Sequence, residues 1–154
     1  MRNAAFSSSS ATHRQGLDRR PAGVDDDTVE ALGKLSEALE WIERARGRLY
    51  DFHQMCGHAD FLFGDAADLL ERAGHREAAE AVRTEIVGRN VIEGRWTFQL
   101  VEEFDATYWS VVRAMERDLC EALIDGVPHV LEAELKRQRT TDGHPAHRAT
   151  PFAD

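Results

Sequence analysis

Histidine and acidic side chains occur in three segments of the chain at spacings that could bring them into the interior of a helical protein. Imidazoles and carboxylates that project inward from facing helices are typical metal ligands in such interiors. The candidate ligands for a divalent metal ion are His53, Asp60, Glu102, Asp105, His129 and Glu132. His129 and Glu132 share a face if both lie on one helix, because residues three apart are neighbours there. A carboxylate–histidine metal site is therefore one hypothesis.

The spacing also sets limits on that hypothesis. A two-metal centre of the ferritin-like type uses Glu-x-x-His on two helices, whereas the analogue here is reversed and occurs once, at His129 and Glu132. His53 and Asp60 lie about 10 Å apart along a helix, so one ion reaches both only if the helix bends at Gly57. The alternative is a buried polar network in which His53 and Asp105 find partners across a helix interface and fix its register.

Aromatic side chains gather in the same two regions, around residues 50–63 and 96–109. They predict either the core where two helices cross or an apolar pocket with polar anchors that takes a small molecule. The residues assigned to this pocket or polar network are His53, Asp60, Asp105, Tyr108 and Trp109. A separate hypothesis is anion binding at a helix N-terminus by Arg89, Asn90 and Arg95. The chain has no recognisable catalytic motif, so we assign no catalytic residues.

The elements that must position these residues are helices. Apolar residues recur every three or four positions from residue 32 to residue 52, and again from residue 101 to residue 122. Gly74, Gly88 and Gly126 mark helix ends, and Pro128 suits the first turn of a last helix. We therefore expect an all-α fold, a small antiparallel bundle with two long and two short helices in residues 25–139. Residues 1–24 and 140–154 are expected to be disordered tails.

Helical geometry assigns a face to each candidate. At about 100° per residue, His53 falls in the middle of the apolar stripe of the first helix. On the helix that begins near Trp96, the same spacing places Tyr108, Met115 and Leu119 on the stripe and Asp105 within about 40° of its centre. An unpaired polar group on such a face costs ~1–3 kcal/mol, so these side chains must find partners.

Composition excludes several classes of partner. The formal net charge is −9, and the positive charge of residues 1–24 leaves the rest of the chain strongly acidic. Phosphate backbones and anionic membranes repel such a surface, so we expect neither nucleic acid nor a membrane as a partner. Cys56 and Cys120 are the two cysteines, which suits a reducing cytoplasm, and the excess of arginine over lysine suggests a bacterial source.

Three segments carry a resemblance to known proteins. HADFLFGDAADLLERAGH at 58–75, GRNVIEGRWTFQLVEEFD at 88–105 and HVLEAELK at 129–136 are similar to a family of short, uncharacterised helical proteins from actinobacteria. The resemblance covers residues 30–140 and implies a cytoplasmic helical protein, but it implies no activity, cofactor or site residue.

The length of the first helix bears on function. A helix of ~30 residues is ~45 Å long, which is long for a domain this small, so part of its apolar stripe is expected to face a partner chain. The sequence therefore favours a protein that acts by binding or assembly, as a homodimer. Metal binding and small-ligand binding are the alternatives.

Overall fold

The computed structural model describes residues 19–147, and the expected all-α fold is confirmed. Within those residues the one strand-like pairing is an isolated bridge between Ile92 and Arg95. The elements are α1 (Asp26–Arg72), α2 (Arg76–Glu85), α3 (Thr97–Phe104), a π-helical turn η1 (Asp105–Trp109), α4 (Ser110–Ile124), α5 (Val130–Arg139) and a short 3-10 turn η2 (Pro145–His147). The described chain divides into two compact units, residues 40–113 and residues 19–39 with 114–147.

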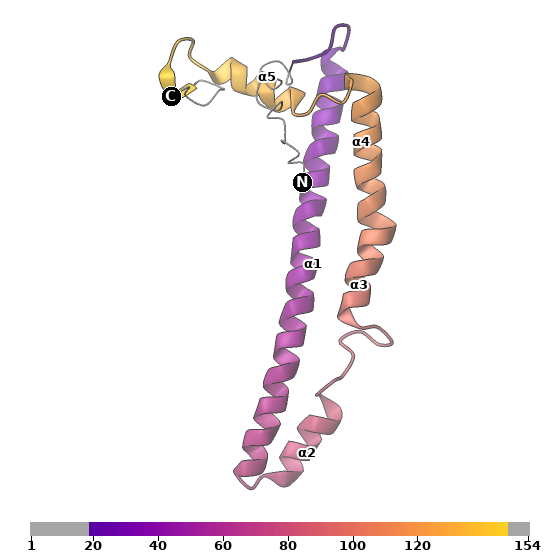
Figure 1. The fold of residues 1–154 in the computed structure, drawn as a ribbon, viewed down its shortest axis with the longest axis vertical. Helices are drawn as coiled ribbons and strands as arrows, with labels where there is room; N and C mark the ends of the chain where they lie inside the picture. The colour runs from indigo at the N-terminus through magenta and orange to yellow at the C-terminus, as the bar shows by residue number, and fades with distance from the viewer. Residues whose placement is uncertain (1–18, 148–154) are drawn as a thin grey trace, which may run out of the picture. The chain divides into compact units, whose positions relative to one another are not determined.

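Helix α1 begins and ends at identifiable signals. The Asp25 carboxylate accepts a hydrogen bond from the Thr28 backbone N–H at 2.7 Å, which caps the first turn. Hydrogen bonding by the Thr28 side chain, and then by its backbone N–H, lowers the pKa of Asp25. Gly74 ends the helix with a φ of +88°, and the His75 N–H bonds to the Leu70 carbonyl, so the predicted stop is confirmed. Between these ends α1 is one unbroken helix that passes through Gly57 (Figure 1).

The second long helical stretch differs from the sequence expectation at its centre. Residues 97–124 are helical as predicted, but η1 interrupts them, and the Ser110 N–H bonds to the Asp105 carbonyl five residues back. A turn of this kind holds one residue more than an α-turn, so it rotates the following residues round the axis. Met115 and Leu119, which follow the turn and were predicted on the buried stripe, are exposed for that reason. Tyr108, also predicted there, lies within the turn and is exposed as well.

The unit formed by residues 19–39 and 114–147 has a small apolar core. Val29, Leu32, Ile124 and Val130 are buried there, from α1, α4 and α5. Arg20 supports this core, because its guanidinium reaches both carboxylate oxygens of Glu134 on α5, at 2.8 and 2.7 Å. The pair lowers the pKa of Glu134.

Parts of both predicted tails are among the described residues and contact the helices or form a turn. Residues 19–24, assigned to the N-terminal tail, place Arg20 on Glu134 and Val24 against the core. Residues 140–147 continue past α5 into η2, where the His147 ring accepts the Thr141 N–H at 3.0 Å. The remaining parts of both predicted tails, 1–18 and 148–154, lie outside the described residues.

The close approach of α1 and α5 at Gly33 yields a stability prediction. A Cβ added at Gly33 would lie 2.1 Å from Cδ2 and 3.0 Å from Cβ of Leu131. Gly33→Ala should therefore lower the free energy of unfolding by about 1–2 kcal/mol, since the overlap exceeds the gain in helix propensity. Gly64→Ala is the matched control in α1, where nothing lies within 4 Å, and it should raise stability by about 0.5–1 kcal/mol. Urea denaturation of both variants checks the prediction, and equal effects would contradict it.

Candidate functional site

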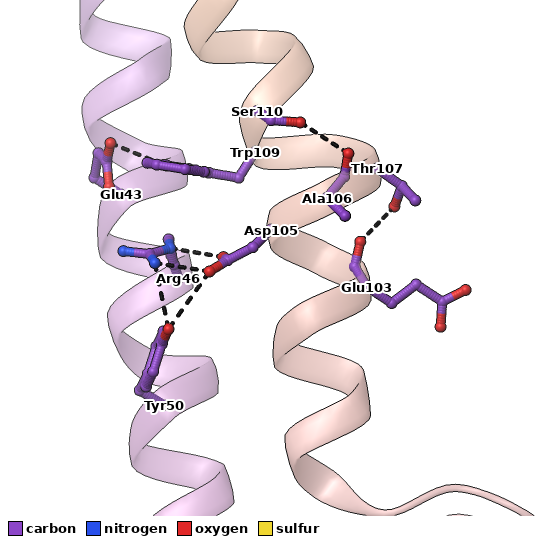
Figure 2. A network of polar contacts seen from close by, with 9 residues as sticks. All are labelled: Glu43, Arg46, Tyr50, Glu103, Asp105, Ala106, Thr107, Trp109 and Ser110. Carbon is purple, nitrogen blue, oxygen red and sulfur yellow. Dashed lines mark hydrogen bonds and ion pairs between the residues drawn. The ribbon is translucent and has the colours of Figure 1, made fainter.

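A polar network joins α1 to the π-turn in the unit of residues 40–113 (Figure 2). Arg46 donates from Nε to Oδ1 and from Nη2 to Oδ2 of Asp105, both at 2.7 Å. The Tyr50 hydroxyl lies 3.4 Å from the same carboxylate. One turn along, the Trp109 indole N–H donates to Glu43 at 2.9 Å, and the Arg46 guanidinium lies 4.4 Å from the Trp109 ring centre. Such a two-pronged ion pair fixes the register of two helices as well as joining them.

The π-turn is what presents both Asp105 and Trp109 to α1. Two hydroxyl groups accompany it: Thr107 donates to the Glu103 carbonyl at 2.6 Å, and Ser110 donates to the Ala106 carbonyl at 2.8 Å (Figure 2). Hydroxyl groups of this kind donate to backbone carbonyls four residues earlier, where the regular backbone hydrogen bonding of the helix is disturbed. The turn places a carboxylate and an indole, four residues apart, over neighbouring turns of α1.

Electrostatics in the network follow from this geometry. The hydrogen bonds and charge of Arg46 hold the pKa of Asp105 below its ordinary value, and Asp105 in turn raises the pKa of Arg46. Both side chains are about one quarter exposed. The carboxylate is therefore ionised and fully engaged, which is typical of a structural contact and leaves no lone general acid or base at this position.

This pKa shift gives a pH prediction. Because the folded pKa of Asp105 is depressed, its contribution to stability is present above the ordinary carboxyl pKa of about 4 and is lost as the pH falls through the folded value. Asp105→Asn should therefore melt below the wild type at pH 6, and the gap should close as the pH falls toward 2.5. The other carboxylates titrate in both proteins, so the difference between the two melting curves isolates Asp105. A gap that stays constant across this range would contradict the assignment.

A hollow of about 490 Å³ lies further along the same unit, between α1, the end of α2, and the loop and first residues of α3. Phe63, Trp96 and Phe98 supply its aromatic surface, and Asp60, Arg89 and Asn90 supply polar groups. Trp96 and Phe98 pack on each other with ring centres 5.5 Å apart. Their exposed faces give the hollow an apolar wall.

Two of the predicted site residues hold the walls of this hollow in place. The Asp60 carboxylate accepts the Gly88 backbone N–H at 2.7 Å, and His53 Nδ1 lies 2.7 Å from the Thr97 hydroxyl at the start of α3. The Asp60 bond ties α1 to the start of the loop at residues 86–96, and the His53 bond ties α1 to the first residue of α3, directly after that loop. His53 and Asp60 are half-buried, and both face this side of α1 as the sequence predicts.

The predicted metal ligands do not form a donor set. Within residues 19–147 no three histidine, cysteine, aspartate or glutamate side chains are grouped so that they could hold an ion. Asp105 is engaged by Arg46, and Glu102 and Glu132 are exposed. His129 does not share a helical face with Glu132, because it precedes α5 in the left-handed region with a φ of 58°.

The two arginines that the anion hypothesis names both contact other groups of the chain. Arg95 forms an ion pair with Glu103, and Arg89 donates to the Glu85 carbonyl at 3.3 Å, so both guanidinium groups have acceptors within the chain. Asn90 lines the hollow beside Arg89. Of the polar-network residues, Tyr108 is exposed, whereas Trp109 is held by Glu43.

Sequence reasoning missed the partners that complete the network, above all Arg46. Arginines are abundant in α1, and Arg44, Arg46 and Arg48 lie within five residues of one another. The available signal was the spacing of Arg46 and Tyr50, which are four apart and lie on the same face as His53.

An exposed apolar strip runs along α1 on a different face. Trp41, Met55, Leu62 and Leu69 are 61%, 63%, 53% and 58% exposed. Met55 lies about 160° round the helix from His53, so the strip points away from α3, which contacts α1 through His53. In the unit of residues 40–113, α2 and α3 both lie on one side of α1 (Figure 1). A second run of exposed apolar residues lies along α4, at Val111, Met115, Leu119 and Leu123.

Comparison with known proteins identifies no relative from which a function could be inferred. No family model, no curated protein and no solved structure matches the chain. None of the helices within residues 19–147 has the length and hydropathy needed to cross a bilayer.

Proposed function

We propose that the protein acts by self-assembly, as a homodimer that uses the exposed apolar strip of α1, and that it binds its partners without chemistry of its own. The observation that carries the proposal is the imbalance between covered and uncovered apolar side chains. Seven hydrophobic residues are buried among residues 19–147, and most of them are small, whereas eighteen large hydrophobic residues are exposed. A chain that leaves this many large apolar side chains uncovered is typical of a protein that buries some of them against another chain.

The exposed apolar residues of α1 are regularly spaced along one face, which favours an interface with another helix rather than apolar residues scattered over the surface. The strip residues Trp41, Met55, Leu62 and Leu69 recur at multiples of seven along one helix. That repeat keeps one face in contact with a second helix over several turns. The two free cysteines, Cys56 and Cys120, are consistent with a cytoplasmic setting for this assembly.

The dependence of thermal stability on concentration tests the proposal. If the folded form is a dimer, unfolding is coupled to dissociation, so the Tm rises as the protein concentration increases. We expect a rise of several degrees between about 1 and 100 μM in full-length protein. A Tm that is unchanged over this range would contradict self-assembly.

A second candidate function rests on the hollow beside Trp96. Its volume of about 490 Å³ and its aromatic wall suit a small, largely apolar molecule, and the Asp60 and His53 contacts hold its walls without filling it. Met55 is not among the residues that line the hollow, whereas Ala59, one turn further along α1, is one of them, so the strip and the hollow are neighbours on this helix.

Binding of the fluorescent probe 1-anilinonaphthalene-8-sulfonate tests the second candidate. We expect saturable binding to the wild type and at least a fivefold weaker affinity for Trp96→Ala, which removes one aromatic wall. Phe61→Ala, which removes an exposed aromatic ring outside both the hollow and the strip, is the control and should retain the wild-type affinity. Equal affinity for the wild type and Trp96→Ala would contradict a ligand site in the hollow.

A further inference from the structure

One side of α1 carries a repeating pattern of large and small side chains, exposed at most positions and half-buried at Phe52 and Ala59. Large residues occupy one heptad position, at Trp41, Arg48, Met55 and Leu62. Four residues after each of them stands the next member of a second series, which reads Ala45, Phe52, Ala59 and Ala66. Spacings of four and three that alternate in this way define the seam of two packed helices. All eight residues lie between 41 and 66, a length of about 38 Å.

We infer that a second copy of this chain packs antiparallel along this seam, in one register. The register sets Trp41 opposite Ala66, Ala45 opposite Leu62, Arg48 opposite Ala59, and Phe52 opposite Met55 of the second copy. The inference rests on the proposed self-assembly and adds the direction and alignment of the two helices. It is a symmetric arrangement, because each chain offers the same strip to the other.

Side-chain size favours this register over a parallel one. In three of the four layers the antiparallel alignment places an alanine against a large residue, which lets the helix axes approach and fills the seam evenly. A parallel alignment would stack Arg48 on Arg48 and Trp41 on Trp41, and would leave alanine facing alanine. Arg48 is held toward Asp51 of its own helix at 3.0 Å, so its guanidinium can stay at the edge of the seam.

Charge complementarity points to the same alignment. The residues that precede the second series along one edge of the seam are Arg44, Asp51, His58 and Asp65. In the antiparallel register Arg44 meets Asp65 of the second copy, and Asp51 meets His58 of the second copy. The first of these pairs unites opposite charges and occurs twice in the dimer. In a parallel pair this edge would instead face Leu49, Cys56 and Phe63, which offer no charge.

Disulfide cross-linking tests the register in a Cys56→Ser, Cys120→Ser background. The double variant Ala45→Cys, Leu62→Cys should form a covalent dimer under mild oxidation, since the register places these two positions opposite each other between chains. Within one chain they lie about 25 Å apart along α1, so no intramolecular bond competes. Ala45→Cys alone and Leu62→Cys alone should remain uncross-linked.

The cross-linking results distinguish a wrong register from a failure of self-assembly itself. Cross-linking of either single variant would indicate a parallel alignment and overturn the register while leaving self-assembly intact. A background protein that assembles but yields no cross-link in the double variant would also overturn the register. A background protein that remains monomeric at every concentration would overturn both.

A charge-exchange cycle gives an independent test. Arg44→Glu and Asp65→Arg should each weaken self-association by roughly tenfold, because each replaces two attractive contacts with two repulsive ones. The double variant should recover most of the wild-type affinity. These two side chains lie about 31 Å apart in one chain, well beyond the Debye length of about 8 Å at physiological salt, so only contact between chains can couple them. Additive effects of the two changes would overturn the inference.

Discussion

Met55→Glu should convert the assembled protein to a monomer. Met55 stands at the centre of the exposed strip of α1 and is 63% exposed in the single chain. Glutamate and methionine have similar helix propensities, so α1 itself should be unaffected. In a dimer, however, the change removes two buried methionine side chains, each worth about 1.5–3 kcal/mol, and adds two carboxylates near the same point. Self-association should weaken at least a hundredfold, as measured by light scattering over a dilution series.

Phe61→Glu is the matched control for this result. Phe61 is the more exposed of the two residues, at 77%, and belongs to the same helix. It lies about 120° round the axis from Met55, outside the strip. The Phe61 variant should keep the wild-type mass. If both variants became monomeric, or neither did, the assignment of the interface to this strip would be wrong.

Asp105→Ala should cause the largest loss of stability in the unit of residues 40–113. It removes the acceptor of both Arg46 bonds and leaves a half-buried guanidinium without its partner. We expect the Tm to fall by roughly 3–8 °C, with circular dichroism as the measurement. Asp118→Ala provides the control, because that aspartate pairs with Arg117 on the open surface and should change the Tm by about 1 °C or less.

The double variant Arg46→Met, Asp105→Leu tests the reason for that loss. If the cost of Asp105→Ala comes from the orphaned charge, removing both partners together should restore most of the stability. A double variant that is less stable than Asp105→Ala alone would show instead that the ion pair itself stabilises the fold.

The sequence was sufficient to predict most of the helices, because their signals are local. Gly74 ends α1, and the apolar spacing near residues 32–52 and 101–122 identifies the two long helical stretches. The π-turn at Asp105–Trp109 was not predictable from a fixed angle of about 100° per residue, and it moved Met115 and Leu119 from the expected stripe to the surface. A single inserted residue is invisible to periodicity until the partner helix is known.

Helical spacing indicates which face of its helix each candidate residue occupies, but it does not indicate the residue's partner. Placing His53, Asp60 and Asp105 on faces that meet other elements required only helical spacing, and all three are half-buried. Their partners Thr97, Gly88 and Arg46 lie 28 to 59 residues away along the chain, and no local pattern selects them. The expectation that His129 shares a helical face with Glu132 was wrong for a related reason, since His129 is left-handed and α5 begins only after it, at Val130.

Sedimentation equilibrium of the full-length chain at neutral pH tests self-assembly through α1 most directly. We expect a mass twice that of the 17.3 kDa chain at micromolar concentrations, and this mass should fall toward the chain mass in Met55→Glu and not in Phe61→Glu. A wild-type mass of 17.3 kDa at every concentration would contradict it.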